Sequence, residues 1–287
     1  MISLAVKTTV ATCLLVLLTI VSFGASTETT NATPIGGYGQ VRYGVSQVKG
    51  FDTCSAPSTS TMQAWWNGSP YWDAIIYLGG ILRGCSQPNL NSGWTEAVHN
   101  QGWDYYLTWV GPQAPCTGFQ YRISLDPATA FNQGQQEASA AMSAAISLGF
   151  TGVNIYYYDM EAFNIGDSAC NWAVKNFVNG WVYWIRVIRG HKAGMYSTPC
   201  AISQWTGVHI GYPPDSIWAA TGNGDPDVWG LECLWDGDWC CQQRLHEYTL
   251  DVWENYGGYW LQIDRNCADG PVTPHGHGIS DGACITE

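Results

Sequence analysis

From about residue 47 onward, short apolar segments alternate along the chain with longer segments of helical pattern. Short runs rich in β-branched and aromatic residues, bounded by glycine, proline or aspartate, are typical of buried strands. Helical segments separate most of these runs. The pattern predicts eight strands, at residues 48–52, 74–77, 105–110, 153–159, 193–196, 217–220, 228–234 and 259–264.

Two of the expected helices carry start signals. Asp126-Pro127 is a capping residue followed by proline at the first helical position, and it opens a run to Leu148 that is rich in Ala, Gln and Glu. Ser168 is expected to cap a run from Ala169 to Ile188, in which aromatic residues recur at helical spacing. The other predicted helices cover residues 59–66, 92–101 and 242–255.

Eight strands alternating with helices over roughly 240 residues match the count and size of a (β/α)8 barrel. The predicted fold is therefore α/β, a single-domain TIM-type barrel. We assign residues 1–25 to a signal peptide, 26–44 to a flexible lead-in, 45–270 to the barrel and 271–287 to a C-terminal tail.

The amino terminus and the cysteines indicate an exported protein. Lys7 precedes an apolar run from Val10 to Phe23, which is shorter than the roughly 20 residues of a membrane span. We expect cleavage and no stable membrane insertion afterwards, with an uncleaved anchor as the alternative. Removal of Cys13 leaves an even number of cysteines, which predicts up to five disulfides in a secreted or cell-wall-associated protein.

Composition narrows the choice of partner. Only 11 Lys and Arg stand against 23 Asp and Glu, which argues against nucleic-acid binding. A neutral or small partner fits better, and some of the 16 Trp and 16 Tyr residues could stack on sugar rings. No cysteine spacing suits zinc, and the pair His275 and His277 in the tail is a weak metal signal, so we expect neither metal nor cofactor.

The most informative stretch is Val153–Glu161, an apolar and aromatic strand that stops at two acidic residues, Asp159 and Glu161. Side chains two apart on a strand point the same way, about 6.6 Å apart along its axis. Paired-carboxylate glycosidases hold their two acids about 5 to 9.5 Å apart. A solvated acidic turn after a strand is the alternative, because a D-x-E pattern is short.

In a barrel the active site lies at the carboxyl ends of the strands. Asp52 and Asp264 end the first and last predicted strands, which are neighbours in a closed barrel, so they are expected to converge with Asp159 and Glu161. Polar and aromatic residues near these ends are candidates for substrate binding. They are Tyr77, Arg83, Trp109, Gln113, Tyr157, Tyr196 and Trp218.

Several of these blocks resemble a known family. The segments 50–54, 76–80, 109–113 and 157–161, with the Ala-rich helix before the last, look like the secreted glycoside-hydrolase-like domain family of unknown function. That family is similar to the family 25 glycoside hydrolases, barrel muramidases that cut peptidoglycan glycan strands. The resemblance implies that Glu161 is the general acid, with Asp159 beside it and Asp52 and Asp264 as supporting carboxylates.

A chitinase of the other barrel family is disfavoured, because its D-x-x-D-x-D-x-E pattern would place aspartates at Asn154 and Tyr157. The leading hypothesis is a secreted, monomeric glycosidase of a cell-wall or amino-sugar polysaccharide. Glu161 would protonate the leaving oxygen, and an ionised Asp159 would act as nucleophile or orient a substrate acetamide. The rival is a barrel that binds glycans without cutting them. An inert disulfide-stapled scaffold would leave the convergent acids unexplained.

Overall fold

The computed structural model describes residues 41–277 and Cys284, so the expected signal peptide and most of the lead-in lie outside the described residues. The strands are β1 (Gly44–Ser46), β2 (Lys49–Asp52), β3 (Tyr71–Gly79), β4 (Asp104–Trp109), β5 (Ile155–Asp159), β6 (Lys192–Ser197), β7 (Ser216–Ala220), β8 (Arg244–Tyr256) and β9 (Tyr259–Val272). The helices are α1 (Thr59–Gly68), α2 (Ser92–Gln101), α3 (Pro127–Ser147), α4 (Ser168–Val182) with its π-helical extension η1 (Tyr183–Ile188), α5 (Pro199–Ile202) and the 3-10 turn η2 (Ser203–Trp205).

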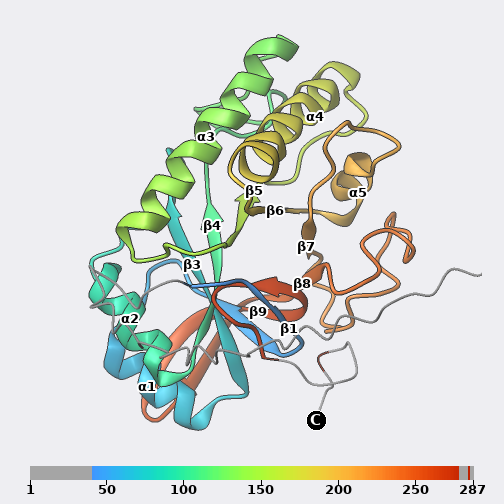
Figure 1. Ribbon diagram of the computed structural model, residues 1–287. Coiled ribbons are helices and arrows are strands. Elements are labelled where there is room, and N and C mark those ends of the chain that lie inside the picture. The colour runs from blue at the N-terminus through green and yellow to red at the C-terminus, as the bar shows by residue number, and fades with distance from the viewer. Residues whose placement is uncertain (1–40, 278–283, 285–287) are drawn as a thin grey trace, which may run out of the picture. The chain divides into compact units, whose positions relative to one another are not determined.

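Strands β2 to β9 close into an eight-stranded barrel, which confirms the predicted fold class (Figure 1). Neighbouring strands from β2 to β8 are parallel, and β9 pairs antiparallel with both β8 and β2. The last strand therefore departs from the all-parallel arrangement of a (β/α)8 barrel. The physical reason is the connection, because Gly257 and Gly258, both with positive φ, turn the chain straight back from β8 into β9.

The helix starts follow from local capping chemistry. The Asp126 side chain accepts a hydrogen bond from the Thr129 backbone N–H at 2.8 Å, and Pro127 opens α3, as predicted. The cap of α4 is Asp167 rather than Ser168, since its carboxylate accepts from the N–H groups of Ala169 and Cys170. This shifts the predicted cap by one residue.

Helices α3 and α4 lie side by side against the barrel (Figure 1). Gly134 of α3 and Gly180 of α4 make their closest approach, because a Cβ atom on either glycine would collide with the backbone of the facing helix. The two helices can pack this closely only while both positions lack a side chain.

Two of the elements predicted from the sequence are wrong. Residues 242–255 were expected to be a helix and instead form most of β8, and residues 228–234 form turns rather than a strand. The spacing of Leu245, Tyr248, Val252 and Tyr256 is helical, but the β8–β9 register shifts twice between Glu247 and Val252. Each shift breaks the two-residue alternation of a strand and so produces a spacing of three or four.

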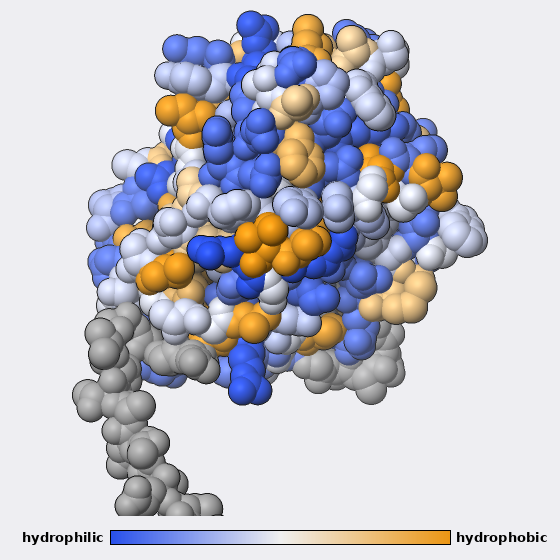
Figure 2. Space-filling model, turned by 45° about the horizontal axis from the view of Figure 1, so that its top comes forward, coloured by the Kyte–Doolittle hydropathy of each residue, from blue (hydrophilic) through white to orange (hydrophobic). Residues whose placement is uncertain are grey.

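Hydrophobic side chains fill the space between the barrel and its helices, and a second cluster fills the barrel interior. On the face shown in Figure 2, the exposed hydrophobic residues form small separate groups among hydrophilic ones. Among the described residues, no helix combines the length and the apolar character needed to span a membrane.

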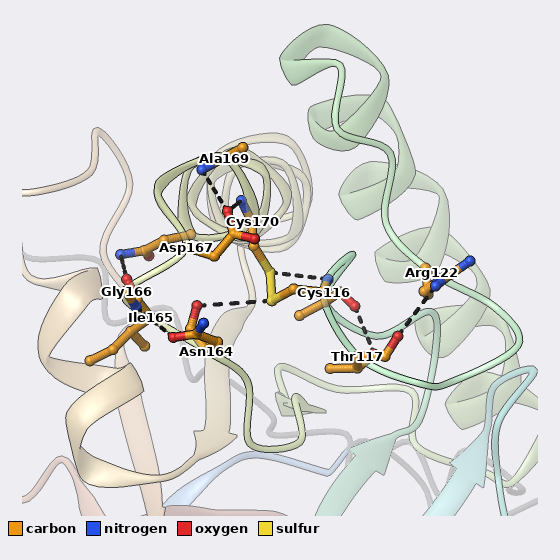
Figure 3. Close-up of a disulfide and its surroundings, with 11 residues drawn as sticks. Cys116, Thr117, Arg122, Asn164, Ile165, Gly166, Asp167, Ala169 and Cys170 are labelled. Atoms are coloured by element: carbon orange, nitrogen blue, oxygen red, sulfur yellow. Dashed lines mark hydrogen bonds between the residues drawn. A yellow bond between two sulfur atoms is a disulfide. The ribbon is translucent and has the colours of Figure 1, made fainter.

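Four disulfides join Cys54 to Cys85, Cys116 to Cys170, Cys200 to Cys233 and Cys267 to Cys284. Cys240 and Cys241 are free and exposed, so four of the up to five predicted bridges form. The second bridge ties the loop after β4 to the first turn of α4, next to the Asp167 cap (Figure 3). The segments that follow β4 and β5 at the barrel mouth are therefore held together covalently.

Candidate active site

A cavity of about 660 Å³ opens at the carboxyl ends of the barrel strands. All four acids expected from the sequence line it, and they come from three strands that are distant in sequence. They are Asp52 at the end of β2, Asp159 and Glu161 at and after the end of β5, and Asp264 in β9. Asp264 was expected to end the last strand, but β9 continues to Val272. Asp264 still reaches the mouth because β9 runs antiparallel and its pairing with β2 begins at this residue. Tyr77 and Arg83, which were expected to bind substrate, also line this cavity.

Strand β5 and one buried glutamine position the acidic pair. Tyr156 and Tyr158 pack into the core around the helices while Tyr157 points into the barrel, so Asp159, two residues on, also faces inward. The fully buried Gln113 donates a hydrogen bond to the Asp159 carbonyl and accepts one from the Glu161 N–H, each at 2.8 Å. Gln113 therefore fixes the backbone on both sides of the turn between the two acids.

The environment of the pair favours protonated carboxyl groups. Burial raises the pKa of Asp159 well above its ordinary value, and the negative charges of Glu161 and Asp52 raise it further. Burial also raises the pKa of the half-buried Glu161. No described group donates a hydrogen bond to Oδ1 of Asp159. The raised pKa of Asp159 differs from the expectation that this residue stays ionised. It indicates instead that Asp159 and Glu161 hold a proton between them.

A second group of acids lies beside the pair, inside the mouth of the barrel. Tyr77 donates to one Asp52 oxygen at 2.9 Å and Asn266 donates to the other at 2.8 Å. Tyr196 donates to Glu247 at 2.7 Å. Burial and the charge of Asp264 raise the pKa of Asp52 to about 7, and burial and the charge of Asp52 raise that of Glu247 to about 9.

Asp264 lies at the rim of this second group. Its carboxylate accepts a hydrogen bond from the Asp251 N–H at 2.6 Å. Oxygen atoms of Asp52, Glu247 and Asp264 lie within 4.8 Å of one another, a spacing that a divalent cation could bridge. Protons shared among the acids would stabilise the same arrangement, as the raised pKa values of Asp52 and Glu247 indicate.

Other residues expected to bind substrate lie elsewhere. Trp109 donates from its indole N–H to Glu137 on α3, outside the barrel. Tyr157 is fully buried and donates to the Pro271 carbonyl. Trp218 is also buried, and it donates to Asn266. Trp218 and Tyr196 therefore support Asn266 and Glu247 and do not line the cavity.

Sequence reasoning missed several residues of this site. Glu247 and Asn266 complete the second acidic group, and Trp253 and Trp260 line the cavity. Glu247 and Trp253 lie in the segment that was predicted to be a helix. Asn266 follows the predicted last strand, whereas Trp260 lies within it. A strand assignment for β8 would have placed Glu247 two residues after the inward-facing Leu245, and thus inside the barrel.

Comparison with known proteins identifies the family. Residues 63–268 match the model described as "Rv2525c-like, glycoside hydrolase-like domain". The chain belongs to this glycoside hydrolase-like family. The matched segment contains Glu161, Asp159, Glu247 and Asp264, whereas Asp52 precedes it. No curated protein matches the sequence.

Solved structures with similar folds have low sequence identity. An uncharacterized B. stearothermophilus protein is 16% identical with a TM-score of 0.50, over 77% of this chain and 95% of that one. The catalytic domain of endolysin ply40 from bacteriophage P40 of Listeria monocytogenes is 15% identical, with a TM-score of 0.46 over 77% and 93% of the two chains. A family 25 glycosyl hydrolase from Bacillus anthracis is 15% identical, with a TM-score of 0.47 over 78% and 90%.

Proposed function

We propose that this glycoside hydrolase-like protein is a secreted glycosidase that cleaves a cell-wall or other amino-sugar polysaccharide, with Glu161 as general acid. The observation that carries the proposal is the cavity at the carboxyl ends of the strands, in which Asp159 and Glu161 meet Asp52 and Asp264. The resemblance to the barrel muramidases directs the choice of polysaccharide, and the four disulfides are compatible with an extracellular location.

In the proposed reaction, Glu161 donates its proton to the glycosidic oxygen as the bond to the anomeric carbon breaks. Its raised pKa keeps that proton available near neutral pH. The pair holds one proton between its two carboxyl groups. In the reactive state that proton lies on Glu161, so Asp159 is the carboxylate that stabilises the positive charge developing on the sugar ring. Asp159 then attacks the anomeric carbon directly or orients a substrate acetamide that attacks it. A water molecule that gives its proton to Glu161 then attacks the anomeric carbon, which releases the sugar and restores the acid.

A glycan-binding barrel without turnover is the second candidate, and the environment of Asp159 favours it. A carboxyl group whose pKa is raised well above its ordinary value by burial and two neighbouring acids holds its proton, and a protonated Asp159 is no nucleophile. The same cavity would then bind a glycan through hydrogen bonds alone.

Reducing-end release separates the two candidates. The parent protein and Glu161→Gln would be incubated with purified peptidoglycan and with N-acetylchitohexaose, and new reducing ends would be counted over time. Release by the parent that is lost in Glu161→Gln supports the hydrolase. Equal release by both contradicts the assigned acid, and binding without release by the parent supports the binding protein.

A further inference from the structure

The β8–β9 hairpin continues past the barrel wall beside the cavity. Strand β8 pairs with β7 only as far as Glu247, and β9 pairs with β2 only from Asp264 onward. Between these points, residues 249–256 and 259–265 pair with each other. The outer part of the hairpin is thus an arm at the rim of the mouth.

The two faces of this arm differ sharply in chemistry. On one face Val252, Leu261 and Ile263 pack against the hydrophobic core. On the other, Trp253 lies opposite Gln262, and Trp260 lies opposite Asn255. Alternation along the strands puts these four side chains on one surface.

The tryptophans on that surface are open to solvent and border the cavity. Trp253 is 62% exposed and Trp260 is 64% exposed, and both line the cavity together with Gln262. A large aromatic side chain this exposed at the edge of a cavity offers an apolar ring face to a ligand.

Hydrogen bonds fix the arm relative to the acids. The register irregularity in β8 places Asp251 at a positive φ of 55°, and its N–H donates to Asp264. The Asp251 carboxylate accepts from Gln262 at 3.2 Å, and across the arm Arg265 forms an ion pair with Glu254 at 2.6 Å. The tryptophans are therefore presented from a braced hairpin and not from a loop.

We propose that Trp253 and Trp260 form a sugar-binding subsite that holds part of the glycan chain beyond the bond at Glu161. This inference rests on the proposed function. The ligand is an uncharged glycan whose pyranose C–H faces lie on the indole rings, with Gln262 and Asn255 within reach of its hydroxyl groups. A polyanionic glycan is disfavoured, because Arg83 is the only cation among the described residues that line the cavity and five acids line it as well.

The test measures affinity for N-acetylchitohexaose by titration calorimetry, with the Glu161→Gln protein as the background that prevents cleavage. Trp253→Ala and Trp260→Ala should each weaken binding about tenfold, because each removes a ring face that the sugar would bury. Trp253→Tyr and Trp260→Tyr should retain most of the affinity, since they keep an aromatic face. Trp172→Ala is the matched control, because Trp172 is 55% exposed on α4, away from the cavity.

In the active parent background, the same Trp→Ala changes should raise KM for the hexaose and leave kcat within about twofold. A double Trp→Ala variant that binds as tightly as its parent overturns the subsite while leaving the hydrolase proposal intact. Tryptophan-dependent binding without reducing-end release supports the subsite and contradicts the hydrolase. If the Glu161→Gln protein binds no N-acetylchitohexaose at all, the subsite for this glycan is overturned.

Discussion

Buried acids lie at both ends of the barrel interior, at its mouth and near its floor. At the mouth, Asp159 and Asp52 line the cavity. Near the floor, Asp73 is fully buried and accepts a hydrogen bond from Ser46 at 2.5 Å, while Asp104 lies 3.3 Å from His277. Burial raises the pKa of an acid in both places.

The difference between the two groups is access. Asp73 is covered by side chains and by the strand that precedes the barrel, and it does not line the cavity. A raised pKa on its own therefore does not mark a catalytic acid, because structural acids in an apolar interior show the same shift. Chemistry requires that the shifted group also meet a space where a substrate can lie.

The largest expected effect is at the mouth. Glu161→Gln keeps the size and hydrogen bonding of the side chain but removes the transferable proton, so kcat should fall by about 10² to 10⁴. Reducing-end release from peptidoglycan would measure it. Glu137→Gln is the matched control, since Glu137 is half-buried with a pKa also raised by burial, yet it bonds Trp109 outside the cavity. An equal loss in both variants would contradict a special role for Glu161.

Asp159→Asn should lower kcat by about 10²-fold or more. The change removes the carboxylate that would stabilise the sugar cation in the reactive state. It also breaks the coupled pair, in which the charge of one carboxylate raises the proton affinity of the other. The pH profile provides a second readout, because the limb assigned to Glu161 should move to lower pH in this variant. Full activity with an unchanged profile would remove Asp159 from the mechanism.

The unfolding free energy of the parent should fall as pH rises, because buried acids at the mouth and near the floor of the barrel have raised pKa values. An acid whose pKa is raised on folding stabilises the protein fully below its unfolded value, and that contribution is lost as pH rises through the folded value. For Asp52 this window runs from 3.8 to about 7. Asp52→Asn should therefore reduce the loss of unfolding free energy between pH 4 and pH 8 by on the order of 4 kcal/mol. Urea unfolding at both pH values measures this, and an equal loss in parent and variant would contradict it.

The smallest expected effect on activity is at the floor. Asp73→Asn should leave kcat within about twofold, because Asp73 does not reach the cavity. The difference in unfolding free energy between Asp73→Asn and the parent should nevertheless favour the variant more at pH 8 than at pH 4.5. At pH 8 the folded parent must either keep a proton on this buried acid or bury its charge, and Asn avoids both costs. A large loss of kcat in a folded Asp73→Asn protein would contradict the conclusion that only the acids at the mouth take part in the reaction.

The positions of residues in the fold could be predicted from the sequence where the signals were local. Asp159 and Glu161 follow a strand that its own composition identifies, and Asp126-Pro127 identifies the start of α3. Prediction failed for Glu247, because the irregular register of β8 gives the spacing of a helix. Gln113 could be noticed from sequence, but its contacts with the backbone at Asp159 and Glu161 could not, because they join segments 46 and 48 residues apart.

The sequence by itself determined most of the alternation of strands and helices, the cap of α3 and the acids at the ends of β2 and β5. These features depend on side-chain periodicity and on hydrogen bonds within one turn of chain. Only the tertiary structure decided that β9 runs antiparallel, that Asn266 and Tyr77 share Asp52, and that Trp253 and Trp260 face the cavity. Those outcomes depend on which distant strands pair and in which register, and a shift of one residue would turn every side chain of a strand to its other face.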